Sequence, residues 1–281
     1  MPKFCRKILV TGGAGYIGSL AVALLLRQGF YVRVLDNLTF GGNGLLPYLT
    51  HPDFDFIHGD IRNDTDMDRA LTDMDGVIHL AAIVGDPACR QNPETAHEVN
   101  KIAAESLCDK AIKRGIQRFV FASTCSNYGK MSDPDRFVTE ETPLKPVSLY
   151  AELKVGFEGY LLARKQTNFV PVVLRFATAY GLSPRPRFDL TVNEFTKELV
   201  MNRTLEVYGE QFWRPYAHVS DLAASCIMAL NAEPTDITGR AFNVGDNFEN
   251  FQKKTLLEMI LRELPDTANM ISHVNRDEDP R

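Results

Sequence analysis

Short apolar runs alternate with longer amphipathic stretches along the first two thirds of the chain. The runs at 7–11, 31–36, 54–58, 77–81, 119–123 and 172–176 predict strands. Between them, apolar residues recur at helical spacing in 19–28, 93–114 and 148–165, and glycines follow the first two of these stretches as helix stops. Because several strand candidates are almost continuously apolar, we expect a doubly wound parallel sheet, covered by helices on both faces.

The pattern changes after residue 180. A proline-rich loop at 183–186 precedes a predicted helix at 190–202, a short strand at 205–208 and a further helix at 221–229. We therefore expect an α/β sheet domain at 1–180, to which parts of 215–245 return, and a smaller C-terminal lobe formed mainly by 181–281. No flexible linker separates these parts, so a cleft between them is the expected substrate site.

Composition excludes several classes of protein. Of 281 residues, 44% are hydrophobic and 24% charged, which is ordinary for a globular chain. The net charge of −5 leaves no basic surplus for nucleic acid. No apolar stretch fits a signal peptide or a membrane span, and the 5 cysteines contain no CxxC pair, so we expect a cytoplasmic protein without disulfides or a membrane partner. The 6 histidines show no metal-ligand spacing, and no metal is expected.

The turn after the first predicted strand carries the clearest chemistry. The sequence TGGAGYIG at 11–18 leads from a strand into a helix. Gly12 permits a tight turn, Gly15 lets a pyrophosphate approach the backbone, and Gly18 lets the helix pack closely on the sheet. A plain structural turn is the alternative. The position of the glycine motif in the first βαβ unit favours a dinucleotide-binding Rossmann domain over a plain turn. In such a domain the pyrophosphate faces the helix N–H groups.

Acidic residues after the second and third strands bear on the choice of dinucleotide. Asp36 can accept hydrogen bonds from the adenosine ribose, and its charge would repel the 2′-phosphate of NADP, so NAD is the expected cofactor. Arg33 lies within the same strand and is interpreted as a surface charge; a clamp for the 2′-phosphate of NADP is the alternative. Asp60 could meet the adenine amino group, or it could equally cap a helix or lie in a loop.

A tyrosine and a lysine are spaced to share one face of a helix. Tyr150 and Lys154 are four residues apart, so the phenol and the ammonium would be neighbours. A nearby ammonium and a nicotinamide cation both favour phenolate, so we expect a lowered Tyr150 pKa and a usable base. Thr124, which ends the fifth predicted strand, can share the hydrogen bond to a substrate oxygen. The alternative is that Tyr150 and Lys154 are ordinary residues of an amphipathic helix and Thr124 an ordinary β-branched strand residue, without catalytic roles.

These motifs occur together in the order of one family. Further along the chain come GDI at 59–61, HLAA at 79–82, Asn100, ST at 123–124 and RPYAHVSD at 214–221. Over nearly its whole length the chain resembles the extended short-chain dehydrogenase/reductases of the NAD-dependent nucleotide-sugar epimerase/dehydratase family. The resemblance implies NAD as cofactor, a nucleotide-diphosphate sugar as substrate, and a homodimer that pairs the helices at 93–114 and 148–165.

The motifs and the resemblance together assign three sets of site residues. The catalytic residues are Thr124, Tyr150 and Lys154. The cofactor-binding residues are Gly12, Gly15, Tyr16, Ile17, Gly18, Asp36, Asn37, Asp60, Ile61, Leu80, Ala81, Ala82, Asn100, Ser123, Tyr150, Lys154, Phe176 and Ala177. The substrate-binding residues are Val84, Thr124, Cys125, Ser126, Thr178, Arg187, Tyr208 and Arg214.

Departures from the family pattern bear on the reaction. In 4,6-dehydratases an Asp-Glu pair follows the catalytic threonine, whereas here Cys125 and Ser126 offer a weak acid and a poor base. Thr178 stands where many relatives carry an asparagine that holds the sugar nucleotide. Arg214 keeps the position that clamps the substrate diphosphate, for which a guanidinium is well suited, and Arg281 would belong to a second such region.

Epimerisation of a nucleotide-linked sugar is the expected reaction. Tyr150 would take the proton of a sugar hydroxyl at C4 while hydride passes to the nicotinamide, and Lys154 would hold ribose hydroxyls. Return of the hydride to the other face of the ketone would give the epimer. The alternatives are a dehydrogenase/reductase or a 4,6-dehydratase that releases a keto-sugar, and a non-catalytic NAD-binding scaffold. The base, the sugar and the reacting carbon stay open.

Overall fold

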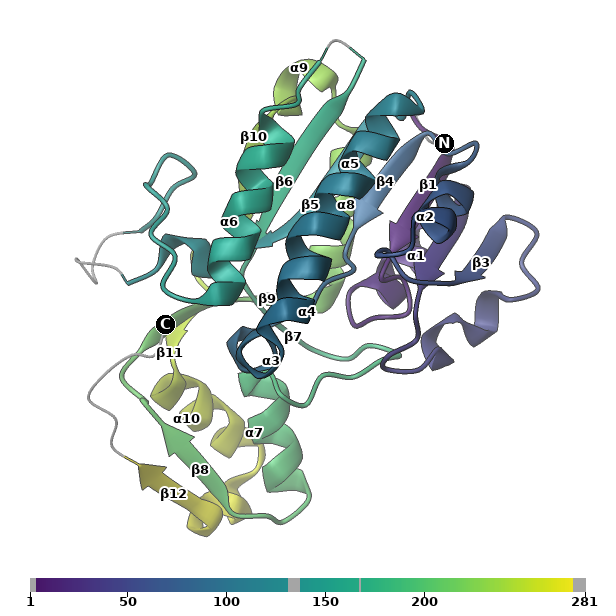
Figure 1. Ribbon diagram of the computed structural model, residues 1–281. Coiled ribbons are helices and arrows are strands. Elements are labelled where there is room, and N and C mark those ends of the chain that lie inside the picture. Colours follow the sequence, from purple (N-terminus) through teal and green to yellow (C-terminus); the bar gives the residue numbers. More distant parts are fainter. Residues whose placement is uncertain (1–3, 131–136, 167, 275–281) are drawn as a thin grey trace.

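A seven-stranded parallel sheet forms the centre of the molecule (Figure 1). The computed structural model describes residues 4–130, 137–166 and 168–274. The strand order is β10-β6-β5-β4-β1-β2-β3, so the winding direction reverses between β1 and β4, where ligands of doubly wound sheets bind. The strands are β1 (Lys7–Thr11), β2 (Tyr31–Asp36), β3 (Phe54–His58), β4 (Gly76–His79), β5 (Arg118–Thr124), β6 (Val170–Phe176) and β10 (Arg240–Val244).

Helices cover both faces of this sheet, as the apolar strands predict. Alternate residues of β1 point to opposite faces: Ile8 and Val10 join one apolar cluster, and Leu9 joins the other. The first cluster contains side chains of α1 (Gly18–Arg27) and α8 (Val219–Asn231). The second contains side chains of α2 (Asp64–Leu71), α5 (Ala104–Lys113) and α6 (Leu149–Leu162). The expected Rossmann α/β fold is confirmed.

The smaller lobe has an apolar cluster of its own. It packs α7 (Thr191–Val200) and α10 (Lys253–Glu263) against β8 (Leu205–Tyr208), which pairs in parallel with β12 (Ile271–Val274). Figure 1 shows this lobe below the large sheet. A three-stranded sheet of β7 (Thr178–Tyr180), β9 (Trp213–His218) and β11 (Asn250–Gln252) lies between them. No helix of the described residues has the length and apolar character needed to cross a bilayer.

Short elements complete the chain. They are η1 (Asn43–Tyr48), α3 (Asp86–Gln91), α4 (Pro93–His97), the π-helical turn η2 (Glu98–Ala103), η3 (Cys125–Tyr128), α9 (Pro234–Ile237) and η4 (Pro265–Met270). The predicted helix at 93–114 is therefore interrupted, because it contains the wider turn η2 between α4 and α5. The predicted helix at 148–165 begins one residue later, since the Ser148 side chain accepts a hydrogen bond from the Ala151 amide at 3.3 Å and caps α6.

A buried polar network joins α6 to β5 and β6. Glu158 of α6 accepts hydrogen bonds from two guanidinium nitrogens of Arg175, one of them at 2.9 Å. The Ser123 hydroxyl and the Asn127 amide both donate to its other oxygen at 3.0 Å. The side chains of Arg175 and Glu158 are only 7% and 3% exposed. The pair therefore fixes α6 relative to the end of β5.

Removing one partner of this ion pair should strongly destabilise the fold. In a Glu158→Gln variant the Arg175 charge stays buried without its counter-ion, so we expect a loss of about 3–5 kcal/mol in the free energy of unfolding. Urea denaturation followed by circular dichroism measures it. Asp109→Asn is the matched control, because it breaks the more exposed Arg164–Asp109 pair and should cost at most about 1 kcal/mol. Equal losses in both variants would contradict the structural role of Glu158.

Candidate active site

The glycine turn between β1 and α1 brings three backbone segments close together. Gly12 has a φ of +73°, and a Cβ there would lie 2.7 Å from the Ala81 amide nitrogen. A Cβ on Gly18 would lie 2.2 Å from the Gly12 carbonyl oxygen. A Cβ on Gly15 would meet a single atom of the described residues within 4 Å, the Gly12 carbonyl oxygen at 3.1 Å. The turn is therefore crowded on the protein side at Gly12 and Gly18 and open at Gly15.

Asp36, at the end of β2, holds its carboxylate over this turn. One oxygen accepts a hydrogen bond from the Ala14 amide at 3.0 Å, and the other accepts one from the Leu38 amide at 2.8 Å. Burial raises the pKa of this carboxyl, and the two amide hydrogen bonds oppose that shift. Each oxygen accepts one of these bonds, and a carboxylate oxygen has a second lone pair with which to accept a ribose hydroxyl. This arrangement fits the adenosine ribose of NAD.

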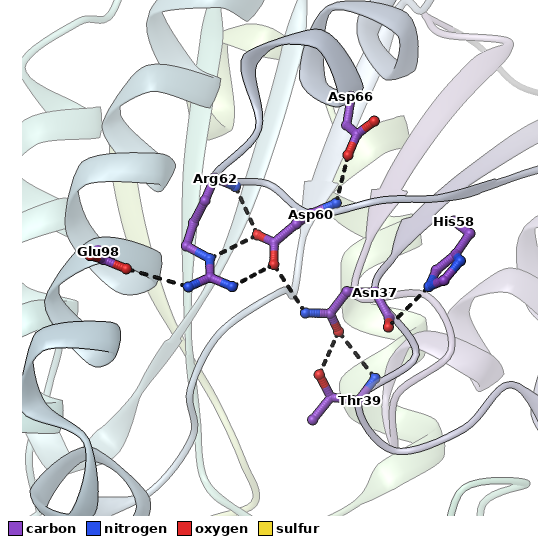
Figure 2. A network of polar contacts seen from close by, with 7 residues as sticks. All are labelled: Asn37, Thr39, His58, Asp60, Arg62, Asp66 and Glu98. Atoms are coloured by element: carbon purple, nitrogen blue, oxygen red, sulfur yellow. Dashed lines mark hydrogen bonds and ion pairs between the residues drawn. The ribbon is translucent and has the colours of Figure 1, made fainter.

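Asp60, after β3, belongs to a polar network that the sequence did not reveal (Figure 2). Arg62 donates to both oxygens of its carboxylate, at 3.1 and 2.8 Å, and the Asn37 amide donates at 3.3 Å. The hydrogen bonds from Arg62 lower the Asp60 pKa to about 2. Arg62 also pairs with Glu98 of η2 at 3.3 Å. The Asp60 carboxylate, which was expected to meet adenine, is thus held by Arg62. In the sequence, the only signal of this pair is that Arg62 follows Asp60 by two residues.

Asn100 fixes the loop that follows β4. Its side-chain oxygen accepts the Ile83 amide at 2.9 Å, and its nitrogen donates to the Ile83 carbonyl at 2.8 Å. The side chain is buried in η2. Its amide is therefore occupied by the protein backbone, and it acts on the expected cofactor-lining residues, Leu80, Ala81 and Ala82, by holding their loop beside Gly12. Val84 in the same loop is exposed.

The three expected catalytic residues come from β5 and α6. Thr124 ends β5, and its hydroxyl oxygen accepts the Ser126 amide at 3.1 Å. Lys154 is buried; its Nζ donates to the Ala122 carbonyl at 2.8 Å and lies 5.9 Å from the centre of the Tyr150 ring. The hydroxyl of Ser123, an expected cofactor contact, is bound to Glu158 instead. The Ala122 carbonyl of β5 thus positions the Lys154 ammonium, and Glu158 binds the end of the same strand through Ser123.

The expected lowering of the Tyr150 pKa by Lys154 is wrong for the structure described. Burial raises the pKa of the phenol above its ordinary value, and this outweighs the opposing charge of Arg187. Burial also lowers the pKa of Lys154 to about 8, with a small opposite effect of Cys89. Desolvation disfavours the charged form of both groups, so their proximity alone does not produce a phenolate. The cation that favours phenolate here is Arg187.

Arg187 lies in the loop between β7 and α7. Its Nε donates to Asp189 at 2.9 Å, and its charge acts on both Tyr150 and Tyr16. The same loop contacts the glycine turn directly: the Tyr16 hydroxyl donates to the Gly181 carbonyl at 2.7 Å, and the Ser183 hydroxyl donates to the Tyr16 carbonyl at 2.6 Å. These contacts join the lobe to the cofactor turn, and no sequence pattern indicated them.

The other expected substrate contacts are spread over the two small sheets and η3. Cys125 and Ser126 begin η3 directly after Thr124. Thr178 of β7 pairs in register with Tyr216 of β9, and Arg214 of β9 donates to the Trp213 carbonyl at 2.7 Å. Tyr208 is exposed on β8. Of the remaining expected cofactor contacts, Phe176, Ala177 and Ile61 are buried, and Ile17 directly precedes α1. Arg281 lies outside the described residues.

Two histidines have structural roles. The Nδ1 of His79 lies 2.8 Å from the Thr11 hydroxyl, and burial lowers its pKa to about 3. His218 accepts the Ser220 amide and caps α8. Arg33, interpreted as a surface charge, lies at a partly exposed position, where its Nε donates to Asp55 at 2.6 Å and its Nη1 donates to the Thr72 carbonyl at 2.7 Å. It is held on β2 by these partners.

A glycine turn at the switch point of a parallel sheet, with a tyrosine and a lysine on α6, defines a dinucleotide-dependent enzyme of the short-chain dehydrogenase/reductase class. The chain belongs to the NAD-dependent epimerase/dehydratase family, whose sequence profile matches residues 8–245. NAD is the cofactor of this family, and the open face of Gly15 together with Asp36 fits it. The expected family and cofactor are confirmed.

Characterised relatives include both reaction types of the family. The chain is 33% identical over 273 residues to a UDP-glucose 4-epimerase of Halalkalibacterium halodurans, covering 90% of this chain and 78% of the relative. It is 32% identical over 281 residues to a dTDP-glucose 4,6-dehydratase of an Actinoplanes species, covering 95% and 85%. Relatives of both reaction types are thus similar to this chain to nearly the same degree.

Solved structures show the same two types. DesIV, a dTDP-glucose 4,6-dehydratase from Streptomyces venezuelae solved with NAD, is 28% identical with a TM-score of 0.86, over 98% of this chain and 86% of that one. The UDP-glucose 4-epimerase of Thermus thermophilus, solved with NAD, is 29% identical with a TM-score of 0.82, over 97% and 88%. The whole described fold is shared with enzymes that bind NAD.

A methyl group at Gly15 should weaken NAD binding without unfolding the chain. In Gly15→Ala the new Cβ has little protein to displace, but it occupies the open side of the turn, so we expect at least a tenfold rise in the NAD dissociation constant, about 1.4 kcal/mol. Equilibrium dialysis measures it. Gly156→Ala on α6, where a Cβ meets nothing within 4 Å of the described residues, is the control and should bind NAD normally. Unchanged affinity in Gly15→Ala would contradict the assignment.

Proposed function

We propose that the chain is an NAD-dependent nucleotide-sugar 4-epimerase. The observation that carries this proposal is that α6, which holds Tyr150 and Lys154, packs against β5 and η3, the segments that meet at Thr124, in a chain whose glycine turn fits NAD. Relatives that act on UDP-glucose support the substrate class. A non-catalytic scaffold would not need these three polar side chains together.

In the proposed reaction, Tyr150 takes the proton of the sugar C4 hydroxyl and later returns it to the same oxygen. Thr124 holds that oxygen by a hydrogen bond, and Lys154, kept in place by the Ala122 carbonyl, supplies positive charge on the β5 side of Tyr150. Bound NAD supplies a hydride acceptor and donor. Because burial raises the Tyr150 pKa, phenolate forms only when positive charge is close, and Arg187 contributes to this.

Arginines of the lobe are proposed to hold the substrate diphosphate. Arg214 lies on β9, and Arg187 lies in the loop that contacts the glycine turn, so both flank the space between the lobe and the sheet domain. We propose that the substrate occupies a cleft there, with Thr178 and Tyr208 as further contacts and Val84 near the sugar. The division into a domain at 1–180 and a lobe at 181–281, with residues of 215–245 in the former, accords with the pairing of β10 with β6.

Loss of water from the sugar is the second candidate, because dehydratases are among the relatives. That elimination needs a proton donor at C6 and a base at C5. The residues after Thr124 are Cys125 and Ser126 on η3, and neither matches a carboxylate acid or base at neutral pH. Full return of the hydride, and so epimerisation, is therefore favoured.

A Tyr150→Phe variant should lose epimerase activity while retaining NAD. We expect kcat for conversion of UDP-galactose to UDP-glucose to fall by about 10²–10⁴-fold, because proton transfer at the reacting oxygen is lost. Mass spectrometry and chromatography of the products measure it and also detect a dehydrated keto-sugar. Tyr160→Phe, on the same helix but bonded to Asp109, is the control and should keep its rate. Equal rates in Tyr150→Phe and the parent chain would overturn the mechanism.

We also propose that the chain is a cytoplasmic homodimer that pairs α4, α5 and α6 with their copies. These helices lie side by side on one face of the sheet (Figure 1). Ile102 of η2, just before α5, is 55% exposed. Sedimentation velocity should give twice the chain mass of 31.5 kDa. Ile102→Glu should shift the chain to a monomer, whereas Met228→Glu, 71% exposed on α8 at the other face, should leave the dimer intact. A monomeric parent chain would contradict this proposal.

A further inference from the structure

The short helix α3 brings an additional carboxylate to Tyr150. Cys89 of α3 forms a small buried cluster with Leu153 of α6, and Tyr150 packs against this cluster. Asp86 precedes Cys89 by three residues and therefore shares its helix face. The face of α3 that carries Asp86 is thus turned toward α6 at Tyr150.

The Asp86 carboxylate has an unusual environment. Its Oδ1 is buried and has no hydrogen-bond partner within residues 4–130, 137–166 and 168–274. Its charge nevertheless acts on the Tyr150 phenol, whose pKa it raises further. A buried carboxylate oxygen without a donor lowers stability, so its presence here calls for an explanation.

The backbone around Asp86 is held firmly. Gly85 has a φ of +93°, a conformation that a side chain would disfavour, and this turns the chain into α3. Two residues earlier, both backbone polar groups of Ile83 are bound by the Asn100 amide. The carboxylate is therefore positioned by the loop and by the packing of α3, and the α3 N-terminus receives no side-chain cap from it.

We propose that Asp86 is a specificity residue for the sugar, accepting a hydrogen bond from a hydroxyl of a neutral sugar and repelling a sugar that carries a carboxylate. This inference rests on the proposed function, in which the sugar C4 hydroxyl meets Tyr150. A sugar bound there presents its neighbouring substituents, C6 among them, to the groups around Tyr150. A carboxylate can only accept hydrogen bonds, which hydroxyls donate and a uronic acid carboxylate does not.

Asp86→Asn tests the proposal, since it keeps the shape of the side chain and removes its charge. The probes are UDP-glucose and UDP-glucuronic acid, titrated calorimetrically into the NAD-loaded protein. We expect the parent chain to prefer UDP-glucose by at least about tenfold, and Asp86→Asn to shift the ratio of the two dissociation constants by about tenfold toward UDP-glucuronic acid. The thermal midpoint of Asp86→Asn should be equal to or above that of the parent chain.

Glu94→Gln is the matched control, because it removes the same charge from an exposed position on α4 and should leave the ratio unchanged. An unchanged ratio in Asp86→Asn, or an equal shift in Glu94→Gln, would overturn the role of Asp86. A lowered thermal midpoint with an unchanged ratio would identify a purely structural carboxylate. The experiment measures binding, so it separates the two proposals. A parent chain that discriminates as expected but turns over neither sugar would contradict the proposed reaction and not the role of Asp86. Binding of neither probe would overturn both.

Discussion

The buried ion pair between Glu158 and Arg175 is the constraint on which the candidate active site depends. It fixes the position of α6 along its axis relative to β5 and β6. The positions of Tyr150 and Lys154 relative to the end of β5 depend on it. The same carboxylate binds Ser123, which directly precedes Thr124, and Asn127, which lies within η3. A single buried charge pair thus fixes the relative place of a strand end and a helix that are far apart in the sequence.

Burial works against the chemistry that this arrangement is proposed to perform. It disfavours both a charged phenolate at Tyr150 and a charged ammonium at Lys154, so reactivity depends on which charges surround them. The charge of Arg187 lowers the Tyr150 pKa and the charge of Asp86 raises it, and the two residues come from separate segments of the chain. The loops that carry them are therefore as important to the phenol as its helical neighbour, although neither belongs to a recognisable motif.

Much of the fold and the outline of the site could be predicted from the sequence, because both depend on local patterns. Apolar runs predicted β1, β2 and β3 with their observed bounds, and glycine spacing predicted the turn. The interruption at η2 could not be predicted, since it accompanies a contact between Asn100 and a loop 17 positions away in sequence. For the same reason the roles of Ser183 and Asp86 could not be predicted, because they come from tertiary neighbours, and the raised pKa of Tyr150 comes from burial.

The hydrogen bonds of Tyr16 have a consequence for how the two ligands influence each other. This residue belongs to the cofactor turn, yet its hydroxyl and carbonyl hold Gly181 and Ser183 of the loop that leads into the lobe. A displacement of the turn would therefore be passed on to the loop that carries Arg187 through these two hydrogen bonds. By thermodynamic reciprocity, occupancy at either end changes affinity at the other by the same factor. The phenol of Tyr16 thus links the turn that fits NAD to the loop that is proposed to hold the substrate diphosphate, within one chain.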